Sequence, residues 1–272
     1  FHLSSTVRDM PPSGIRKFFD IVVGMEDVIS LGVGEPDFPT PWHIREACIY
    51  SLECGHTSYT SNKGLIELRE ILAESTKEEL DLDYDPEEEI LITTGVSEAV
   101  DLAFRATLNP GDEVIVPQPC YVAYVPDVLL AGGVPKPVAT RLSEEFKLRP
   151  EDFRDAIGER TKALVLSYPN NPTGAIMTRE DLEEIADLVV ENDLLVISDE
   201  VYGKLTYDGD HASFAQLEGM RGRTVVLNGL SKSCAMTGWR IGYAIGDPAI
   251  IGAMTKVHQY TMLCAPTMAQ VA

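Results

Sequence analysis

Apolar positions along the chain follow two different spacings. Leu65, Leu68 and Leu72 recur every three or four positions, which is typical of one face of an amphipathic helix. Short unbroken apolar runs, such as residues 194–197, are typical of strands that are buried on both faces. The pattern predicts helices at residues 41–54, 64–80, 97–108, 179–191 and 248–262, and strands at 90–92, 113–116, 163–166, 194–198, 224–227 and 241–245.

The regular alternation of helices and strands predicts the architecture. Such a chain forms a mainly parallel sheet with helices on both faces, a three-layer α/β/α domain, here expected over residues 41–272. Residues 1–40 lack a clear period and are predicted to form an N-terminal arm. In open parallel sheets, ligands bind beyond the carboxyl ends of the strands. Polar residues that follow the predicted strands are therefore the first candidates for a site.

Composition and charge exclude several classes of function. The 272 residues include 22 Lys and Arg against 43 Asp and Glu, a formal net charge of −21, which disfavours nucleic acid and anionic membranes as partners. No apolar run is long enough to span a bilayer, and the first twenty residues do not resemble a signal peptide. The five cysteines form no CxxC pair and the five histidines show no metal-ligand spacing. We therefore expect no disulfide framework, no metal and a reducing, cytoplasmic location.

Candidate chemistry is densest in residues 231–243, where Lys232 precedes Arg240 by eight positions. A lysine that attacks a carbonyl gains from poor solvation and from a cationic neighbour. An arginine binds phosphate through two parallel hydrogen bonds. The pair indicates a pocket for a phosphorylated aldehyde that Lys232 holds as an imine. Taken alone, the two residues also fit a strand-edge lysine and a surface arginine.

Three further segments follow predicted strands. Residues 94–99 place Gly95 in a turn before a helix, whose first N–H groups can bind phosphate. Asn171 is presented by a loop that two prolines stiffen. Asp199 ends a strand and precedes Tyr202 by three residues, and such a carboxylate can keep a pyridine nitrogen protonated. Each segment alone also fits a plain turn or cap, but their succession at consecutive strand ends favours one shared site.

Two rival interpretations explain fewer residues. Residues 32–34 begin like a dinucleotide-binding fingerprint, but Asp37 stands where the third glycine belongs. Ser231 and Lys232 could form a hydrolase dyad, which would leave Arg240 and Asp199 without roles.

With these motifs the chain resembles the pyridoxal-phosphate (PLP) enzymes of fold type I, specifically the class I and II aminotransferases of the aspartate and aromatic type. The resemblance runs from residue 31 to the end of the chain. It implies transfer of an amino group from an L-amino acid to a 2-oxo acid. The motifs that carry it are LGVGEPDF at 31–38, Tyr59 with GLIELR at 64–69, NPTG at 171–174, DEVY at 199–202, SK at 231–232 and GWR at 238–240.

The resemblance also implies a role for each site residue. Lys232 would bind the cofactor as an imine and then move the proton at the substrate α-carbon, while Asp199 would pair with the pyridine nitrogen. Gly34 and Asn171 would lie near the substrate. The remaining cofactor contacts would be Tyr202 and Asn171 on the 3′-oxygen, Tyr121 on the ring face, and Arg240, Ser231 and the turn of Gly95, Val96 and Ser97 on the phosphate. Tyr59 would reach the phosphate of the partner subunit, which makes the active unit a homodimer with shared sites.

The chain departs from the family pattern in two ways. Gly229 stands where relatives often carry a phosphate-binding serine. A C-terminal small domain, which in the family supplies an arginine for the substrate carboxylate, is expected to be largely absent, so that residues 1–40 would hold only the start of that domain. We expect these 272 residues to transaminate inefficiently.

Several alternatives stay open from the residues. The cofactor chemistry also suits a carbon–sulfur β-lyase, a non-catalytic PLP-binding regulatory domain or an inactive relative. The amino acid is equally open among aspartate, alanine, aromatic amino acids and diaminopimelate.

Overall fold

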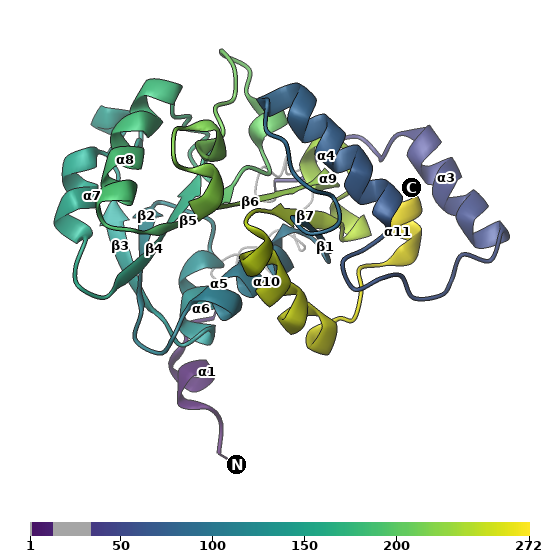
Figure 1. Ribbon diagram of the computed structural model, residues 1–272, viewed down its shortest axis with the longest axis horizontal. Helices are drawn as coiled ribbons and strands as arrows, with labels where there is room; N and C mark the ends of the chain where they lie inside the picture. Colours follow the sequence, from purple (N-terminus) through teal and green to yellow (C-terminus); the bar gives the residue numbers. More distant parts are fainter. Residues whose placement is uncertain (1, 13–33) are drawn as a thin grey trace, which may run out of the picture.

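The computed structural model describes residues 2–12 and 34–272. Residues 13–33 hold much of the predicted N-terminal arm and the first part of the motif at 31–38, and they lie outside the described residues. In the described part, a seven-stranded sheet is covered by helices on both faces (Figure 1). The predicted three-layer α/β/α architecture is confirmed.

The sheet is mostly parallel and places β5 at its centre. In space the strands follow the order β1-β7-β6-β5-β4-β2-β3. β7 is antiparallel to both of its neighbours, and the other neighbouring pairs are parallel. The carboxyl ends of β2, β4, β5 and β6 therefore meet at one edge. The strand bounds are β1 (Ile90–Thr93), β2 (Glu113–Gln118), β3 (Val134–Ala139), β4 (Thr161–Ser167), β5 (Leu195–Asp199), β6 (Thr224–Gly229) and β7 (Gly242–Ile245).

The helices form the two outer layers around three apolar clusters. Helices α5, α6 and α10 pack on one face of the sheet, where Phe104, Tyr124 and Ile251 are buried (Figure 1). Helices α7 and α8 bury Phe153 and Ile185 on the other face, which α4 also covers. The helix bounds are α1 (Ser5–Asp9), α3 (Trp42–Glu53), α4 (Ile66–Leu80), α5 (Val96–Thr107), α6 (Tyr124–Leu130), α7 (Pro150–Ala156), α8 (Arg179–Glu191), α9 (Leu230–Ser233), α10 (Pro248–Thr261) and α11 (Thr267–Val271).

Capping residues determine where the long helices begin. Thr178 and Asp181 form a reciprocal capping box at the start of α8. Asp247 accepts a hydrogen bond from the Ala249 amide, and Pro248 occupies the first turn of α10, where its missing N–H is not needed. These local signals explain why the predicted starts of both helices agree with the structure.

The pattern of apolar residues failed to predict β3, α6 and α7. Strand β3 contains Pro135 and Pro137, which cannot donate to a strand ladder and so argue against a strand. The structure accommodates both because β3 is an edge strand that pairs with β2. Helices α6 and α7 have seven residues each, too few to show a clear helical period.

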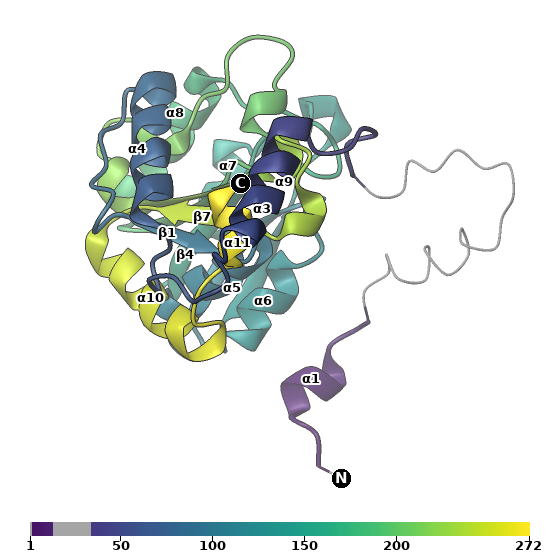
Figure 2. The same cartoon turned by 90° about the vertical axis from the view of Figure 1, so that its right-hand side faces the viewer.

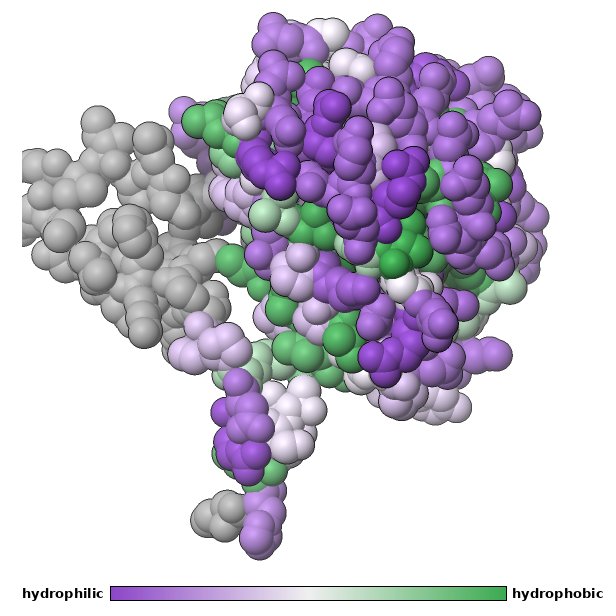
Figure 3. Space-filling view, turned by 90° about the vertical axis from the view of Figure 1, so that its left-hand side faces the viewer, coloured by the Kyte–Doolittle hydropathy of each residue, from purple (hydrophilic) through white to green (hydrophobic). Residues whose placement is uncertain are grey.

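The outer surface carries many hydrophilic side chains. On the side of the domain shown in Figure 3, hydrophilic residues predominate. On the opposite side, α3 lies beside α11 (Figure 2). Among the helices in the described ranges, none has the length and apolar character needed to cross a membrane.

Candidate active site

A cavity of about 570 Å³ lies at the carboxyl edge of the parallel strands. It is bounded by the ends of β4 and β5, the first turn of α5 and the short helix α9. The structure brings most of the sequence-predicted site residues into its lining, namely Gly34, Val96, Ser97, Tyr121, Asn171, Asp199, Tyr202, Ser231, Lys232 and Arg240. Gly95 adjoins the lining through its contact with Arg240, whereas Tyr59 is not part of it.

Asp199 provides a buried carboxylate where the central strand β5 ends. Only 5% of the residue is exposed. Its Oδ2 accepts a hydrogen bond of 2.7 Å from the Tyr124 hydroxyl, and its Oδ1 accepts one of 3.2 Å from the Val201 amide. Burial raises the pKa of Asp199 to about 6, although both hydrogen bonds oppose the shift. A cationic ring nitrogen beside this carboxylate would offset its desolvation.

Tyr124 belongs to this site, and the sequence reasoning missed it. Its ring is buried in α6 and meets the ring of Tyr121 edge to face, with centroids 5.6 Å apart. Burial raises the pKa of Tyr124, so the hydroxyl keeps its proton and donates to Asp199. Tyr124 begins α6 and follows Tyr121 by three residues, and this short spacing between two tyrosines was the available signal.

Lys232 extends from α9 into the cavity. Its Nζ donates to the Gly34 carbonyl oxygen and lies 5.7 Å from the centre of the Tyr202 ring. Partial burial lowers the pKa of Lys232, and Arg240 lowers it further, while Glu35 acts in the opposite direction. A lysine in this environment is more readily deprotonated than one at the surface, and the free amine is the nucleophilic form.

Tyr202 and Asn171 present paired polar atoms to the cavity. The Asn171 Nδ2 lies 3.4 Å from the Tyr202 hydroxyl oxygen, which it reaches from the loop after β4. Burial raises the pKa of Tyr202, so its hydroxyl stays protonated at neutral pH. Together they form a donor pair suited to a phenolic oxygen.

The turn before α5 comes very close to Arg240. Gly95 has a φ of 77°, and a Cβ atom on it would lie 2.5 Å from the Arg240 Nη2 atom. Glycine is therefore required both by the backbone conformation and by the guanidinium. Nη1 of Arg240 donates to the Thr237 carbonyl oxygen at 3.0 Å, which orients the side chain. A guanidinium beside a helix N-terminus is a site for a phosphate.

Gly229 has a structural reason in this chain. A Cβ on Gly229 would lie 3.0 Å from Cγ2 of Val96 and 3.1 Å from the Ile241 carbonyl oxygen. A serine at this position would crowd the same turn that adjoins Arg240. The glycine at position 229, where relatives often carry a serine, is thus coupled to the valine at position 96.

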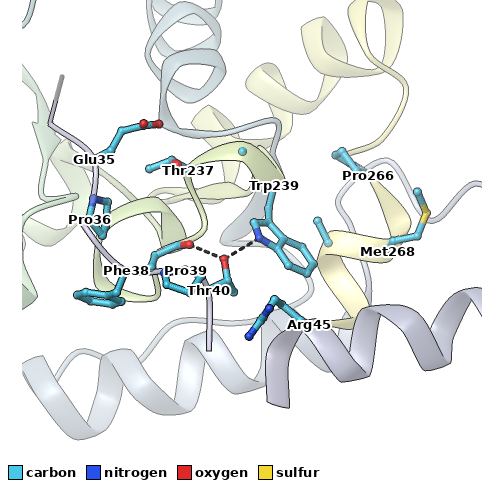
Figure 4. Close-up of a pocket in the computed structure, with 13 residues that line it drawn as sticks. Glu35, Pro36, Phe38, Pro39, Thr40, Arg45, Thr237, Trp239, Pro266 and Met268 are labelled. Carbon is cyan, nitrogen blue, oxygen red and sulfur yellow. Dashed lines mark hydrogen bonds between the residues drawn. The ribbon is translucent and has the colours of Figure 1, made fainter. Parts of the chain in front are cut away.

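The segment that precedes α3 is tied to the lysine segment by Thr40. The buried Thr40 hydroxyl donates to the Ala235 carbonyl oxygen and accepts from the Trp239 Nε1 atom at 2.9 Å (Figure 4). These contacts border a second cavity of about 590 Å³, which shares Glu35 and Thr237 with the first. Thr40 therefore anchors the segment that carries Gly34 to the segment that carries Lys232.

Tyr59 lies outside both cavities and is 81% exposed. Its loop is held where the Thr267 hydroxyl donates to the Ser58 carbonyl oxygen. In the described ranges, no group of three or more His, Cys, Asp or Glu residues could hold a metal ion.

Comparison with known proteins places the chain in a family. The family described as aminotransferase class I and II matches residues 26–272. The chain is 52% identical over 271 residues to the YugH protein of Bacillus subtilis, and the match covers all of this chain and 70% of that protein. It is 48% identical over 262 residues to the aspartate aminotransferase of Pyrococcus abyssi, covering 96% of this chain and 67% of that enzyme.

Solved structures similar to this chain point to the same family. The aspartate aminotransferase of Thermus thermophilus with maleate superimposes with a TM-score of 0.94 at 43% identity, over 100% of this chain and 71% of that chain. The chain therefore belongs to the class I and II aminotransferases, which are PLP-dependent enzymes of fold type I. It is a transaminase that moves an amino group from an amino acid to a 2-oxo acid.

Proposed function

We propose that the 570 Å³ cavity is the site where this aminotransferase binds PLP and its substrates. One observation carries the proposal. The Lys232 amine, the Asp199 carboxylate and the Arg240 guanidinium line the same cavity as the open N-terminus of α5. An aldehyde, a protonated ring nitrogen and a phosphate are the groups that these donors and acceptors suit, and PLP carries all three.

The donor set fits the cofactor. The obligatory glycine at 95 lets the guanidinium of Arg240 approach the helix terminus, so a phosphate can be held from two sides. The Ser97 hydroxyl, which lies 3.5 Å from the Tyr121 hydroxyl, and the buried Ser231 add donors at the same end. Tyr121 offers an aromatic face to the ring.

Asp199, Tyr202 and Asn171 orient and polarise the ring. When bound, the cofactor supplies a ring that withdraws electrons from the substrate α-carbon. Asp199 holds a proton at the ring nitrogen, which strengthens that withdrawal. The Tyr202 hydroxyl and the Asn171 amide would hold the 3′-oxygen of the cofactor.

Lys232 has two successive tasks. Its Nζ would hold the aldehyde group of the cofactor, and its lowered pKa favours the unprotonated amine that this bond requires. The same amine, once free, would move the proton at the substrate α-carbon. The Gly34 carbonyl oxygen contacts Nζ. This contact brings the arm to the substrate side of the cavity, where Asn171 also lies.

A homodimer with shared sites accounts for Tyr59. Its side chain is exposed and lies outside both cavities of its own chain, and we assign its hydroxyl to the phosphate in the partner subunit. The exposed side chains of Ile49, Tyr50 and Leu52 on α3 provide apolar surface for such contact. This is the same arrangement that the family resemblance implies.

The division of the chain into domains follows from the same proposal. Residues 41–272 are assigned to the cofactor-binding large domain, and residues 1–40 to the arm and the start of a smaller domain. All five cysteines are free thiols, which suits a reducing cytoplasm.

A single-turnover experiment tests the function. The protein is loaded with PLP, mixed with one amino acid at a time and followed by cofactor absorbance. The donors are aspartate, aromatic amino acids and N-acetyl-LL-diaminopimelate, after the names of the relatives. We expect at least one donor to convert the cofactor to its amine form, and a 2-oxo acid to reverse the change. Pyruvate and ammonia released from cystathionine without an acceptor would instead show a β-lyase.

Lys232→Ala is the matched control for this experiment. It should remove the absorbance of the covalent imine and slow the half-reaction by roughly 10²–10⁴-fold, the usual contribution of a general acid–base group. An unchanged spectrum and rate would refute the assignment of Lys232.

A further inference from the structure

A buried carboxylate links the turn before α5 to a distant helix. Glu98 is the third residue of α5, and its Oε2 accepts a hydrogen bond of 2.5 Å from the Thr94 amide. Its Oε1 accepts a hydrogen bond of 2.7 Å from Nδ1 of His258 in α10. Glu98 is largely buried and His258 completely so. The contact spans 160 positions of sequence and joins two helices on the same face of the sheet.

The Glu98 carboxylate determines which amides of the turn remain available. The Thr94 N–H is used by Glu98, and the Gly95 N–H donates to the Thr93 carbonyl oxygen at 2.8 Å. Val96 and Ser97 are the first two residues of α5, so their amides have no intrahelical acceptor. Both residues line the cavity, at the end where Arg240 lies.

The turn has little room to move. A Cβ on Gly242 would lie 2.6 Å from the Val96 nitrogen, and one on Gly95 would meet Arg240 at 2.5 Å. Backbone and guanidinium are therefore already packed against the turn on two sides. His258 and Glu98 hold the turn from a third side, through the Thr94 amide. The Nε2 of His258 is buried and has no hydrogen-bond partner in the described ranges, so the ring is committed to Glu98.

We propose that Glu98 and His258 are positioning residues that aim the Val96 and Ser97 amides at the cofactor phosphate. The inference rests on the proposed function of the cavity. His258 orients the Glu98 carboxylate, and Glu98 fixes the Thr94–Gly95 peptide. Neither side chain lines the cavity.

The competing explanation is that the pair only stabilises the packing of α5 against α10. The two explanations differ in their dependence on the phosphate. A positioning role weakens the binding of PLP but leaves the binding of pyridoxal, which lacks the phosphate, nearly unchanged. A purely stabilising role lowers the melting temperature and leaves the ratio of the two dissociation constants as it was.

The experiment measures the dissociation constants of PLP and pyridoxal for the cofactor-free protein and its variants. In Glu98→Ala we expect PLP to bind about tenfold more weakly, the range for loss of a hydrogen bond to a charged group, and pyridoxal to change by less than about twofold. His258→Leu should shift the ratio in the same direction, because it leaves the Glu98 carboxylate without its partner. Glu98→Gln, which keeps an acceptor for Thr94, should recover most of the ratio.

Asp101→Ala is the matched control. Asp101 is another carboxylate of α5, but its partner is Arg105, one turn further along the helix. Its removal should leave the ratio of PLP to pyridoxal binding at the wild-type value. An unchanged ratio in a folded Glu98→Ala variant would overturn the inference. A wild-type protein that does not prefer PLP to pyridoxal would instead refute the phosphate site on which the inference rests.

Amide exchange on the unmodified protein decides the matter if Glu98→Ala does not fold. In the cofactor-free protein we expect the Thr94 amide to exchange slowly and the Val96 and Ser97 amides to exchange faster. Inorganic phosphate should slow exchange at Val96 and Ser97 and change Thr94 little. Fast exchange at Thr94, or no response of Val96 and Ser97 to phosphate, would contradict the proposed arrangement.

Discussion

The hydroxyl group of Tyr124 donates a hydrogen bond of 2.7 Å to Oδ2 of Asp199, a residue 75 positions later in the chain. Both residues are buried. The contact joins α6 to the end of the central strand and leaves the carboxylate pointing at the cavity. Tyr124 therefore supports the Asp199 carboxylate, which we assign to the ring nitrogen of the cofactor.

Tyr124→Phe tests this support. The change removes one hydrogen bond to a charged acceptor, worth about 1.5–3 kcal/mol, and keeps the ring and its packing. Because this bond lowers the pKa of Asp199, its loss raises that pKa and weakens the hold on a protonated ring nitrogen. The rate of the half-reaction with an amino acid should fall roughly 10–100-fold. A rate equal to that of the wild type would show that Val201 alone positions the carboxylate.

Asp199→Asn should make the stability of the cofactor-free protein less dependent on pH. Burial raises the pKa of Asp199 from 3.8 to about 6 in the folded state. Between these values the folded state binds more protons than the unfolded state, so the free energy of unfolding decreases as pH rises through this window. The resulting loss is about 3 kcal/mol above pH 6, and asparagine, which does not titrate, avoids it.

Denaturant unfolding at several pH values checks this sign. The stability of Asp199→Asn relative to the wild type should be highest at pH 7–8 and should decrease as the pH is lowered toward 4. The same variant should transaminate poorly, because an amide cannot hold a proton on the ring nitrogen as an anion does. A gain that grew at low pH would contradict the assignment.

Gly229→Ser should be poorly tolerated unless Val96 is reduced as well. The new Cβ would lie 3.0 Å from Cγ2 of Val96, so the single variant should lose about 1–3 kcal/mol of stability, the usual cost of overpacking. In the double variant with Val96→Ala the clash is relieved, and most of the loss should be recovered. Thermal unfolding of the two single variants and the double variant measures this coupling. Additive effects would show that Ile241, and not Val96, limits the position.

Thr40→Val should loosen the chain that carries Gly34. The substitution keeps the shape but leaves the Ala235 carbonyl oxygen and the Trp239 Nε1 without their partner, at about 1–3 kcal/mol for each buried group. We expect a higher KM for the amino acid with little change in PLP affinity. Thr40→Ser keeps the hydroxyl and is the matched control. Equal loss of PLP affinity and substrate affinity would place the effect in the Lys232 segment and not in the arm.

Local signals in the sequence determined much of this protein. Apolar spacing predicted the strands at the centre of the sheet, and the polar residues that follow them, such as Asn171, Asp199 and Lys232, were identified because strand ends and turn residues are local features. Parallel strands bring such ends to one edge, so these residues could be expected to line one cavity without knowing the strand order.

Contacts between distant segments were decided by the tertiary structure alone. Apolar spacing states which side of an element is buried but not what it is buried against. Tyr124 beneath Asp199 and His258 beside Glu98 follow from helices that dock on one face of the sheet. The proline-containing edge strand β3 and the crowding between Gly229 and Val96 also depend on neighbours far away in the sequence. These contacts form only when the sheet closes and its helices pack, and no local pattern encodes that geometry.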